Sequence, residues 1–276
     1  MPRKNEKESS SIDRKTSRRL DRPQIATRVN ALGQPIGPAI SNRSPRSLPS
    51  DEPLKGHHCT LLRLDPDRHA AGLFEAFAED ESGRNWTYLP YGPFDDLDAF
   101  SAWLHTLASK RDPLFYTISG EDAKPEGMAS YLRIDPHQAT IEVGHIHFSP
   151  SMQRTPMATE AMYLMMRNAF DVLGYRRYEW KCDALNAPSR AAAERLGFIF
   201  EGVFYKASHY KGRNRDTAWF SIVDDEWPAR KDAFEGWLAP DNFDVDGKRI
   251  ESLQAIASRL VSEAKAQGIE RYSQTD

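Results

Sequence analysis

Cysteine and long apolar runs are both scarce in this sequence. The only two cysteines, Cys59 and Cys182, form no CxxC pair and provide no disulfide framework. No apolar run approaches the ~20 residues that a membrane-spanning helix needs, and the N-terminus lacks the apolar core of a signal peptide. We therefore expect a cytoplasmic protein without a membrane partner, because a reducing compartment is the usual setting for so little cysteine.

Aromatic residues are missing from the first fifty positions. Residues 1–50 contain no Phe, Tyr or Trp and carry eleven Lys or Arg against four Asp or Glu, whereas the whole chain has a net charge of −3. Such a segment buries too little apolar surface to offset the entropy lost on ordering. We predict a disordered basic tail at residues 1–28 and an extended arm at residues 29–58. Because the remainder is acidic, we do not expect nucleic acid as the main ligand.

The remaining residues suit one large domain with an appendage, since 39% of the 276 residues are hydrophobic. We predict that the domain covers residues 59–228 and that a helical extension covers residues 229–276. Within the extension, apolar residues mark one face of an amphipathic helix at residues 249–266: Ile250, Leu253, Ala257, Leu260, Val261 and Ala264. This helix could dock on its own domain, which is the simpler case, or on a second subunit, so a monomer and a homodimer are both open.

Alternating strands and helices predict an α+β (α/β) fold. Helices open at Asp65-Pro66, with Ala70, Leu73, Phe74 and Phe77 inward, and at Asp95-Asp96, with Leu97, Phe100, Leu104 and Leu107 inward. A short turn joins strands 127–134 and 140–148, so these strands should pair antiparallel. Strand 175–183 follows a crossover helix and should lie parallel to strand 140–148. Further strands are expected at residues 60–64, 114–119, 198–208 and 217–223, the last two around a basic loop at residues 211–216.

A strand, a short loop and a helix follow one another between Ile141 and Gly174. Residues alternate along the strand, and this period places two sets on opposite faces: Ile141, Val143, His145 and His147 on one, and Glu142, Gly144, Ile146 and Phe148 on the other.

The helix of this stretch is predicted to begin at Pro156, with Thr155 as its cap, and to end at Gly174. Its buried face is marked by residues at helical spacing: Ala158, Ala161, Met162, Met165, Ala169 and Val172. The first N–H groups of such a helix lack internal partners and attract anions, and Arg154 adds a positive charge. An anion site is therefore possible here, although an ordinary crossover without a ligand has the same signature.

Two segments resemble motifs of a known superfamily. Residues 153–158 read Gln-Arg-Thr-Pro-Met-Ala and resemble the Q/R-x-x-G-x-G/A loop of the GCN5-related N-acetyltransferases (GNAT). Residues 186–198 read NAPSRAAAERLGF and resemble the N-x-x-S/A…L-G-F segment of the same superfamily. Glu201-Gly202-Val203 and a long final hairpin follow, as in the branch that includes the ribosomal-protein N-terminal acetyltransferases. The resemblance covers Cys59 to Trp227.

This resemblance implies the GNAT acyl-CoA N-acyltransferase fold, with a central mixed, mostly antiparallel sheet flanked by helices. It implies an enzyme that transfers acetyl from acetyl-CoA directly to a primary amine, on a small molecule or a protein N-terminus, without a metal. The residues that it implies for acetyl-CoA lie on the central strand, the loop and the next helix: Ile146, His147, Phe148, Gln153, Arg154, Thr155, Met157, Ala158, Thr159, Asn186 and Ser189. Helix capping alone would also explain Ser189.

Three side chains compete to take the proton from the amine. Glu142 resembles a strand carboxylate that some relatives use through water, and burial would raise its pKa toward a useful range. His145 and His147 need no such shift near neutral pH. We predict Glu142 first and His147 second, with Ser189 near the sulfur. The acceptor wall is expected in the aromatic segment at Trp86, Tyr88, Tyr91 and Phe94, which core packing would explain equally well.

Two departures from the superfamily pattern motivate an alternative function. Pro156 stands where glycine is usual, so one amide of the phosphate cradle is absent. Ala193 stands where many members carry a tyrosine that protonates the leaving thiolate, so a tyrosine acid from that position is excluded. The alternative is a non-catalytic acyl-CoA-binding or regulatory module.

Overall fold

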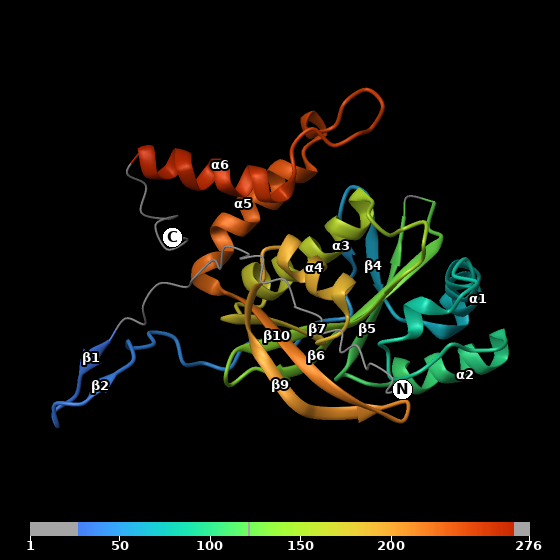
Figure 1. Ribbon diagram of the computed structural model, residues 1–276, viewed down its shortest axis with the longest axis horizontal. Helices are drawn as coiled ribbons and strands as arrows, with labels where there is room; N and C mark the ends of the chain where they lie inside the picture. The colour runs from blue at the N-terminus through green and yellow to red at the C-terminus, as the bar shows by residue number, and fades with distance from the viewer. Residues whose placement is uncertain (1–26, 121, 268–276) are drawn as a thin grey trace, which may run out of the picture.

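One mixed sheet forms the centre of the protein (Figure 1). The computed structural model describes residues 27–120 and 122–267, so the predicted tail at residues 1–28 lies outside the described residues except for its last two. Eight strands follow the order β3-β4-β5-β6-β7-β8-β10-β9, and only β7 and β8 pair parallel. This confirms the predicted fold class. The strands are β3 (Leu54–Lys55), β4 (Thr60–Arg63), β5 (Leu114–Ser119), β6 (Pro125–Asp135), β7 (Thr140–Phe148), β8 (Arg177–Asp183), β9 (Ile199–Tyr210) and β10 (Arg213–Val223).

Helices cover both faces of the sheet. On one face, α1 (Pro66–Ala78) and α2 (Leu97–Ala108) bury a cluster around Phe100 and Phe115. On the other, α3 (Pro156–Arg167), α4 (Ala187–Arg195) and α5 (Trp227–Leu238) enclose the larger core, and α6 (Leu253–Ala266) packs against α5 (Figure 1). Short 3₁₀ turns lie at Arg84–Trp86, Asp224–Glu226 and Pro240–Asn242. No helix within the described ranges is long and apolar enough to cross a membrane.

Residues 29–58, predicted as an extended arm, contain strands. Strands β1 (Arg28–Val29) and β2 (Pro35–Ile36) form a hairpin that projects from the body, and β3 extends the main sheet beside β4 (Figure 1). The turn after β3 is tied to α3, because the Glu160 carboxylate accepts the backbone N–H groups of His57 (2.8 Å), His58 (2.6 Å) and Cys59 (2.9 Å). A Cβ at Gly56 would clash with this carboxylate, so a larger residue there would displace Glu160 from its three donors.

A bulge in β7 overturns the predicted division of its faces. His145 has a φ of +51°, and the pairing with β6 shifts between Gly144↔Ser130 and His147↔Met128. Beyond Gly144 the alternation is therefore reversed. His145 and His147 lie against the rings on the α1–α2 side, whereas Ile146 and Phe148 pack against the core that contains Ile141 and Val143.

Helix ends account for the other differences from the sequence predictions. Thr155 caps α3 and Pro156 is its first residue, as predicted. The helix then widens into a π-helical segment, Asn168–Val172, which changes the register and leaves Val172 72% exposed instead of buried. Leu97 and Ile250 are also exposed, because Leu97 is the first residue of α2 and α6 begins only at Leu253.

The basic segment at residues 211–216 is a strand for most of its length and not a loop. Strands β9 and β10 run to Tyr210 and from Arg213, so only Lys211 and Gly212 form the turn. Gly212 has a φ of +70°, which suits a tight hairpin turn. The hairpin is therefore longer and stiffer than predicted, and it carries its positive charges on strands.

Candidate active site

The parallel pair β7 and β8 separates within the sheet. These strands pair only from Thr140↔Arg177 to Val143↔Trp180. From Gly144 to Phe148, β7 keeps its β6 neighbour but has no strand partner on its β8 side within the described part of the chain. Backbone groups along this edge that no strand or side chain engages can pair with an extended ligand. Three of the predicted acetyl-CoA residues, Ile146, His147 and Phe148, lie on this edge.

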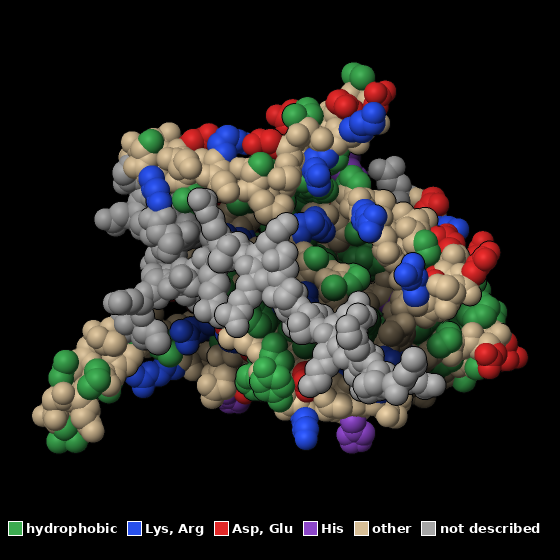
Figure 2. Space-filling view, in the orientation of Figure 1, with side chains coloured by type: hydrophobic (Ala, Val, Ile, Leu, Met, Phe, Trp, Pro, Cys, Tyr) green, Lys and Arg blue, Asp and Glu red, His purple; other side chains and the backbone are tan. Residues whose placement is uncertain are grey.

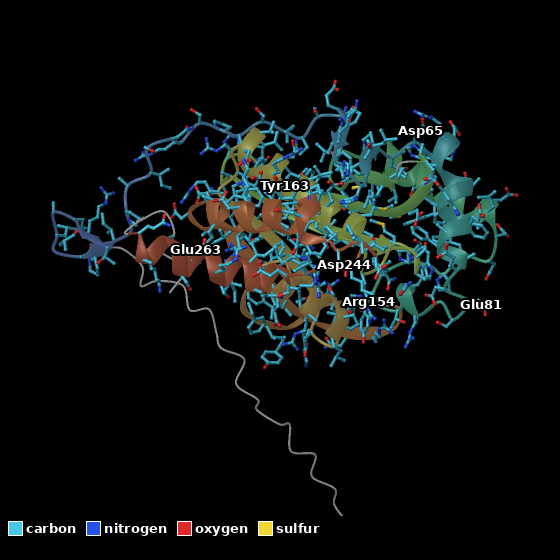
Figure 3. The ribbon with its side chains drawn as sticks, turned by 90° about the horizontal axis from the view of Figure 1, so that it is seen from above. Asp65, Glu81, Arg154, Tyr163, Asp244 and Glu263 are labelled. Atoms are coloured by element: carbon cyan, nitrogen blue, oxygen red, sulfur yellow. The ribbon has the colours of Figure 1, made fainter. Side chains whose placement is uncertain are left out.

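The loop after β7 leads directly to the N-terminus of α3. The Thr155 hydroxyl accepts the Ala158 N–H (3.3 Å) and donates to the Met152 carbonyl (2.6 Å), which fixes the first turn. The Gln153 amide donates to the Phe148 carbonyl (3.0 Å) and ties the loop to the end of β7. Arg154 is exposed at this corner (Figure 3), and Met157, Ala158 and Thr159 belong to the first turn of α3.

Arg195, at the end of α4, adds a positive charge that the sequence reasoning missed. Its guanidinium donates to the Thr159 hydroxyl (3.2 Å) and forms no ion pair with any described carboxylate. Burial lowers the pKa of Arg195, and the nearby Arg249 acts in the same direction. Figure 2 shows several Lys or Arg side chains around a hollow on this face, over α3 and α4. The helix N-terminus and these cations together suit a phosphate ligand.

Glu142 is buried between two cations. Both carboxylate oxygens lie 2.8 Å from Nη1 of Arg133, and one lies 2.8 Å from Nζ of Lys181. Lys181 also contacts Glu179 (2.7 Å) and lies 3.8 Å above the Trp219 ring. Burial raises the pKa of Glu142, whereas Lys181 and Arg133 oppose that increase. The carboxylate thus joins β6, β7 and β8 at the point where β7 and β8 begin to separate.

His147 is enclosed by aromatic rings. Its ring lies 4.1 Å from that of Phe77 and 4.0 Å from that of Trp86, centroid to centroid. Both ring nitrogens are buried and have no hydrogen-bond partner among the described residues. Burial lowers the pKa of His147 to about 3, so the imidazole is neutral at pH 7. Within the described part of the chain, no group is hydrogen-bonded to it that could receive or deliver a proton.

His145 is held in one orientation by Tyr91. The Tyr91 hydroxyl lies 2.8 Å from Nδ1 of His145, and the two rings stack with an interplanar angle of 14°. Burial and, in decreasing order, the charges of Arg133, Arg215 and Lys110 together lower the pKa of His145 to about 4. The imidazole is therefore neutral at pH 7 and lies at the bulge, next to the free edge of β7.

The predicted acceptor residues fall into two pairs. Trp86 and Phe94 pack into the cluster of α1 and α2, with their rings 5.6 Å apart, so core packing explains both. Tyr88 and Tyr91 are nearer to the diverging strands: the Tyr88 hydroxyl donates to the Leu185 carbonyl (3.1 Å), and Tyr91 contacts His145.

The β9–β10 hairpin closes over this region. Nζ of Lys211 donates to the Trp86 carbonyl (2.8 Å), and the Arg213 guanidinium donates to the Thr87 carbonyl. The Tyr210 hydroxyl donates to Asp183 at the end of β8 (2.8 Å). Lys211 in the turn and Arg213 at the start of β10 thus join the hairpin to the segment after α1, which sequence spacing alone could not indicate.

Comparison with known proteins identifies the family. The acetyltransferase (GNAT) domain family matches residues 59–199. A GCN5-related N-acetyltransferase from Brucella melitensis is 43% identical over 79% of this chain and 100% of its own, with a TM-score of 0.78. The chain belongs to the GNAT family of acetyltransferases. This confirms the resemblance found in the sequence, and no curated protein matches the chain.

Two further solved structures share the GNAT fold. A probable acetyltransferase of the GNAT family from Chromobacterium violaceum is 41% identical over 71% of this chain and 98% of its own, with a TM-score of 0.66. A putative ribosomal-protein-serine acetyltransferase from Vibrio cholerae is 18% identical over 63% of this chain and 98% of its own, with a TM-score of 0.55. At that identity the Vibrio structure shows a shared fold alone.

The second GNAT motif contains all of α4, with Asn186 as its N-cap. The Asn186 side chain accepts the Ser189 N–H (3.1 Å), so capping accounts for its position. The Ser189 hydroxyl accepts from Nε1 of Trp180 (3.0 Å). Ala193, at the position of the family's tyrosine, is fully buried in the core. The roles of Asn186 and Ser189 toward a ligand stay predictions.

Proposed function

We propose that this GNAT protein transfers acetyl from acetyl-CoA directly to a primary amine, in the cytoplasm. The free β7 edge carries the proposal, because it leads without a break to the N-terminus of α3 and to two cations, Arg154 and Arg195. An extended pantetheine arm matches the open edge, and phosphates match the helix N-terminus. Pro156 removes one backbone N–H from the phosphate cradle. At the first position of a helix this N–H would make no hydrogen bond within the helix, so proline is tolerated there.

We propose His145 as the group that takes the proton from the amine, through a water molecule. Its side chain is neutral at pH 7 and oriented by Tyr91, whereas Glu142 is engaged by Arg133 and Lys181. His147 lies against two rings, and both its ring nitrogens are buried without a hydrogen-bond partner among the described residues. The order of preference from the sequence, Glu142 and then His147, is thus replaced by His145.

Ligand-induced stabilisation tests the cosubstrate. At a concentration of about 100 Kd, acetyl-CoA should stabilise the protein by about 2.7 kcal/mol, an increase of several degrees in Tm. Adenosine diphosphate, which lacks the pantetheine arm, should produce a smaller shift. No shift at millimolar acetyl-CoA would contradict the proposal.

The Arg195→Gln variant tests the phosphate site. Loss of a charge-assisted contact should raise the Kd for acetyl-CoA about tenfold or more. Arg259→Gln is the matched control, because Glu251 and Glu263 already neutralise Arg259 on α6. Equal affinities of the two variants would remove Arg195 from the site. Binding without thiol release, across a broad set of amines, would establish the non-catalytic module instead.

A further inference from the structure

Arg215 is a partly buried cation without a counterion among the described residues. It lies on β10, two residues after Arg213, and its Nε is buried without a hydrogen-bond partner among the described residues. The adjacent carboxylate, Asp216, is occupied elsewhere: it accepts the Lys206 N–H (2.7 Å) and the Asn214 amide (2.9 Å). Because an isolated buried charge is costly, an unpaired guanidinium of this kind suggests an anionic ligand.

The guanidinium lies where β7 and β8 diverge. It is 5.9 Å from the Tyr210 ring, and the Tyr210 hydroxyl is bound to Asp183 at the end of β8. Its charge acts on both strands. It contributes to the lowered pKa of His145 on β7, and it opposes the rise in pKa that burial causes for Cys182 on β8. Arg215 therefore lies next to the end of β8, within electrostatic range of the proposed proton acceptor.

The surroundings of His145 are positive. The charges that perturb its pKa belong to Arg133, Arg215 and Lys110, which are all cationic. Two carboxylates at the diverging strands are engaged: Glu142 by Arg133 and Lys181, and Asp183 by the Tyr210 hydroxyl and the Leu185 N–H (2.9 Å). A site of this kind disfavours an acceptor that is only a cation and favours one that brings a negative charge with its amine.

We propose that the acceptor carries a carboxylate close to its reacting amine, and that Arg215 binds this carboxylate. The inference rests on the proposed acetyl transfer and names the class of acceptor. A guanidinium binds a carboxylate through two parallel N–H donors, so Arg215 would fix the orientation of the acceptor as well as its affinity. The α-carboxylate of a free amino acid and an acidic side chain near a peptide N-terminus offer the same chemistry.

Matched acceptors test the inference. Thiol release from acetyl-CoA is measured with free amino acids and with their C-terminal amides, and with dipeptide amides that differ only as Asp against Asn at the second position. The carboxylate member of a productive pair should have a kcat/KM about tenfold to a hundredfold higher. The first set of pairs reports an α-carboxylate and the second an acidic side chain, so the two sources are distinguished.

Three variants assign any preference to the arginine. Arg215→Gln should abolish the preference for carboxylate acceptors and leave the acetyl-CoA affinity and the Tm unchanged. Arg215→Lys should retain part of this preference, because lysine keeps the positive charge but lacks the two parallel N–H donors of a guanidinium. Lys206→Gln, an exposed position on the same hairpin, removes an equal charge and should leave the preference unchanged. Comparing preferences between variants cancels the intrinsic difference in basicity between the paired amines.

The outcomes separate the two proposals. Turnover with no carboxylate preference, or a preference that survives Arg215→Gln, overturns the assignment of Arg215 and leaves the acetyl transfer intact. Absence of thiol release with every acceptor, although acetyl-CoA binds, overturns the proposed function and this inference with it.

Discussion

His145 and Glu142 lie three residues apart on β7. We propose the neutral His145 as the proton acceptor, whereas the Glu142 carboxylate is the counterion of Arg133 and Lys181. We expect His145→Gln to lower kcat/KM by about a hundredfold or more with little change in acetyl-CoA affinity, because it removes the proton acceptor alone. Glu142→Gln should instead lower the stability, since it leaves Arg133 and Lys181 without their shared counterion. Steady-state kinetics and thermal unfolding of both variants check this. A collapse of turnover in Glu142→Gln alone would return the role to Glu142.

The pKa of His145 depends on individual charged residues near its ring. In the wild-type protein its pKa is lowered to about 4 by burial and by Arg133, Arg215 and Lys110. Removing one positive charge makes the imidazolium easier to form, so Arg215→Gln should raise the pKa of His145. Imidazole signals followed by NMR across pH measure it, with Lys206→Gln as the control. An unchanged pKa in Arg215→Gln would place the guanidinium elsewhere.

Elements marked by local chemistry could be predicted from the sequence, and those set by tertiary contacts could not. Thr155 and Pro156 fixed the start of α3 in advance, because capping depends on adjacent residues. The bulge at His145 has no such local signal, since its contacts are with Tyr91 and with strands β5 and β6. The face of His147 was therefore predicted wrongly. Arg195 and Arg215 were missed for a related reason: an unpaired cation is visible only once its neighbours are known.

The cap of α3 gives a prediction at the scale of this element. Thr155→Ala removes both hydroxyl contacts of the first turn and should lower the stability by about 1 kcal/mol, a fall of about 2–4 °C in Tm. Acetyl-CoA affinity should fall with it if this turn holds the phosphates. Thr155→Ser keeps the hydroxyl and should retain both properties, so an equal loss in the serine variant would show that the methyl group matters instead.

Acid should destabilise the whole molecule through its buried imidazoles. The pKa of His147 is about 3 in the folded protein and has its ordinary value of about 6.5 in the unfolded chain. Between these values the unfolded chain binds a proton that the folded protein excludes, so stability rises with pH and is lost as pH falls from 6.5 toward 3. The slope is at most about 1.4 kcal/mol per pH unit for this group, and His145 acts in the same direction.

Denaturant unfolding at pH 7, 6 and 5 measures this slope. His147→Phe, which places a third ring between Phe77 and Trp86, should flatten the dependence whatever its effect on the absolute stability. The same slope in wild type and variant would show that other groups control acid unfolding.

The turn at His57 and His58 limits how far the protein can be truncated from its N-terminus. The family match begins at Cys59, yet the Glu160 carboxylate on α3 is held by the backbone of residues 57–59. A truncated gene that starts at the family boundary would delete two of these three donors and leave a buried negative charge poorly satisfied. We therefore expect the smallest segment that folds on its own to be longer than the segment matched by the family. A truncated coding sequence should begin upstream of β3.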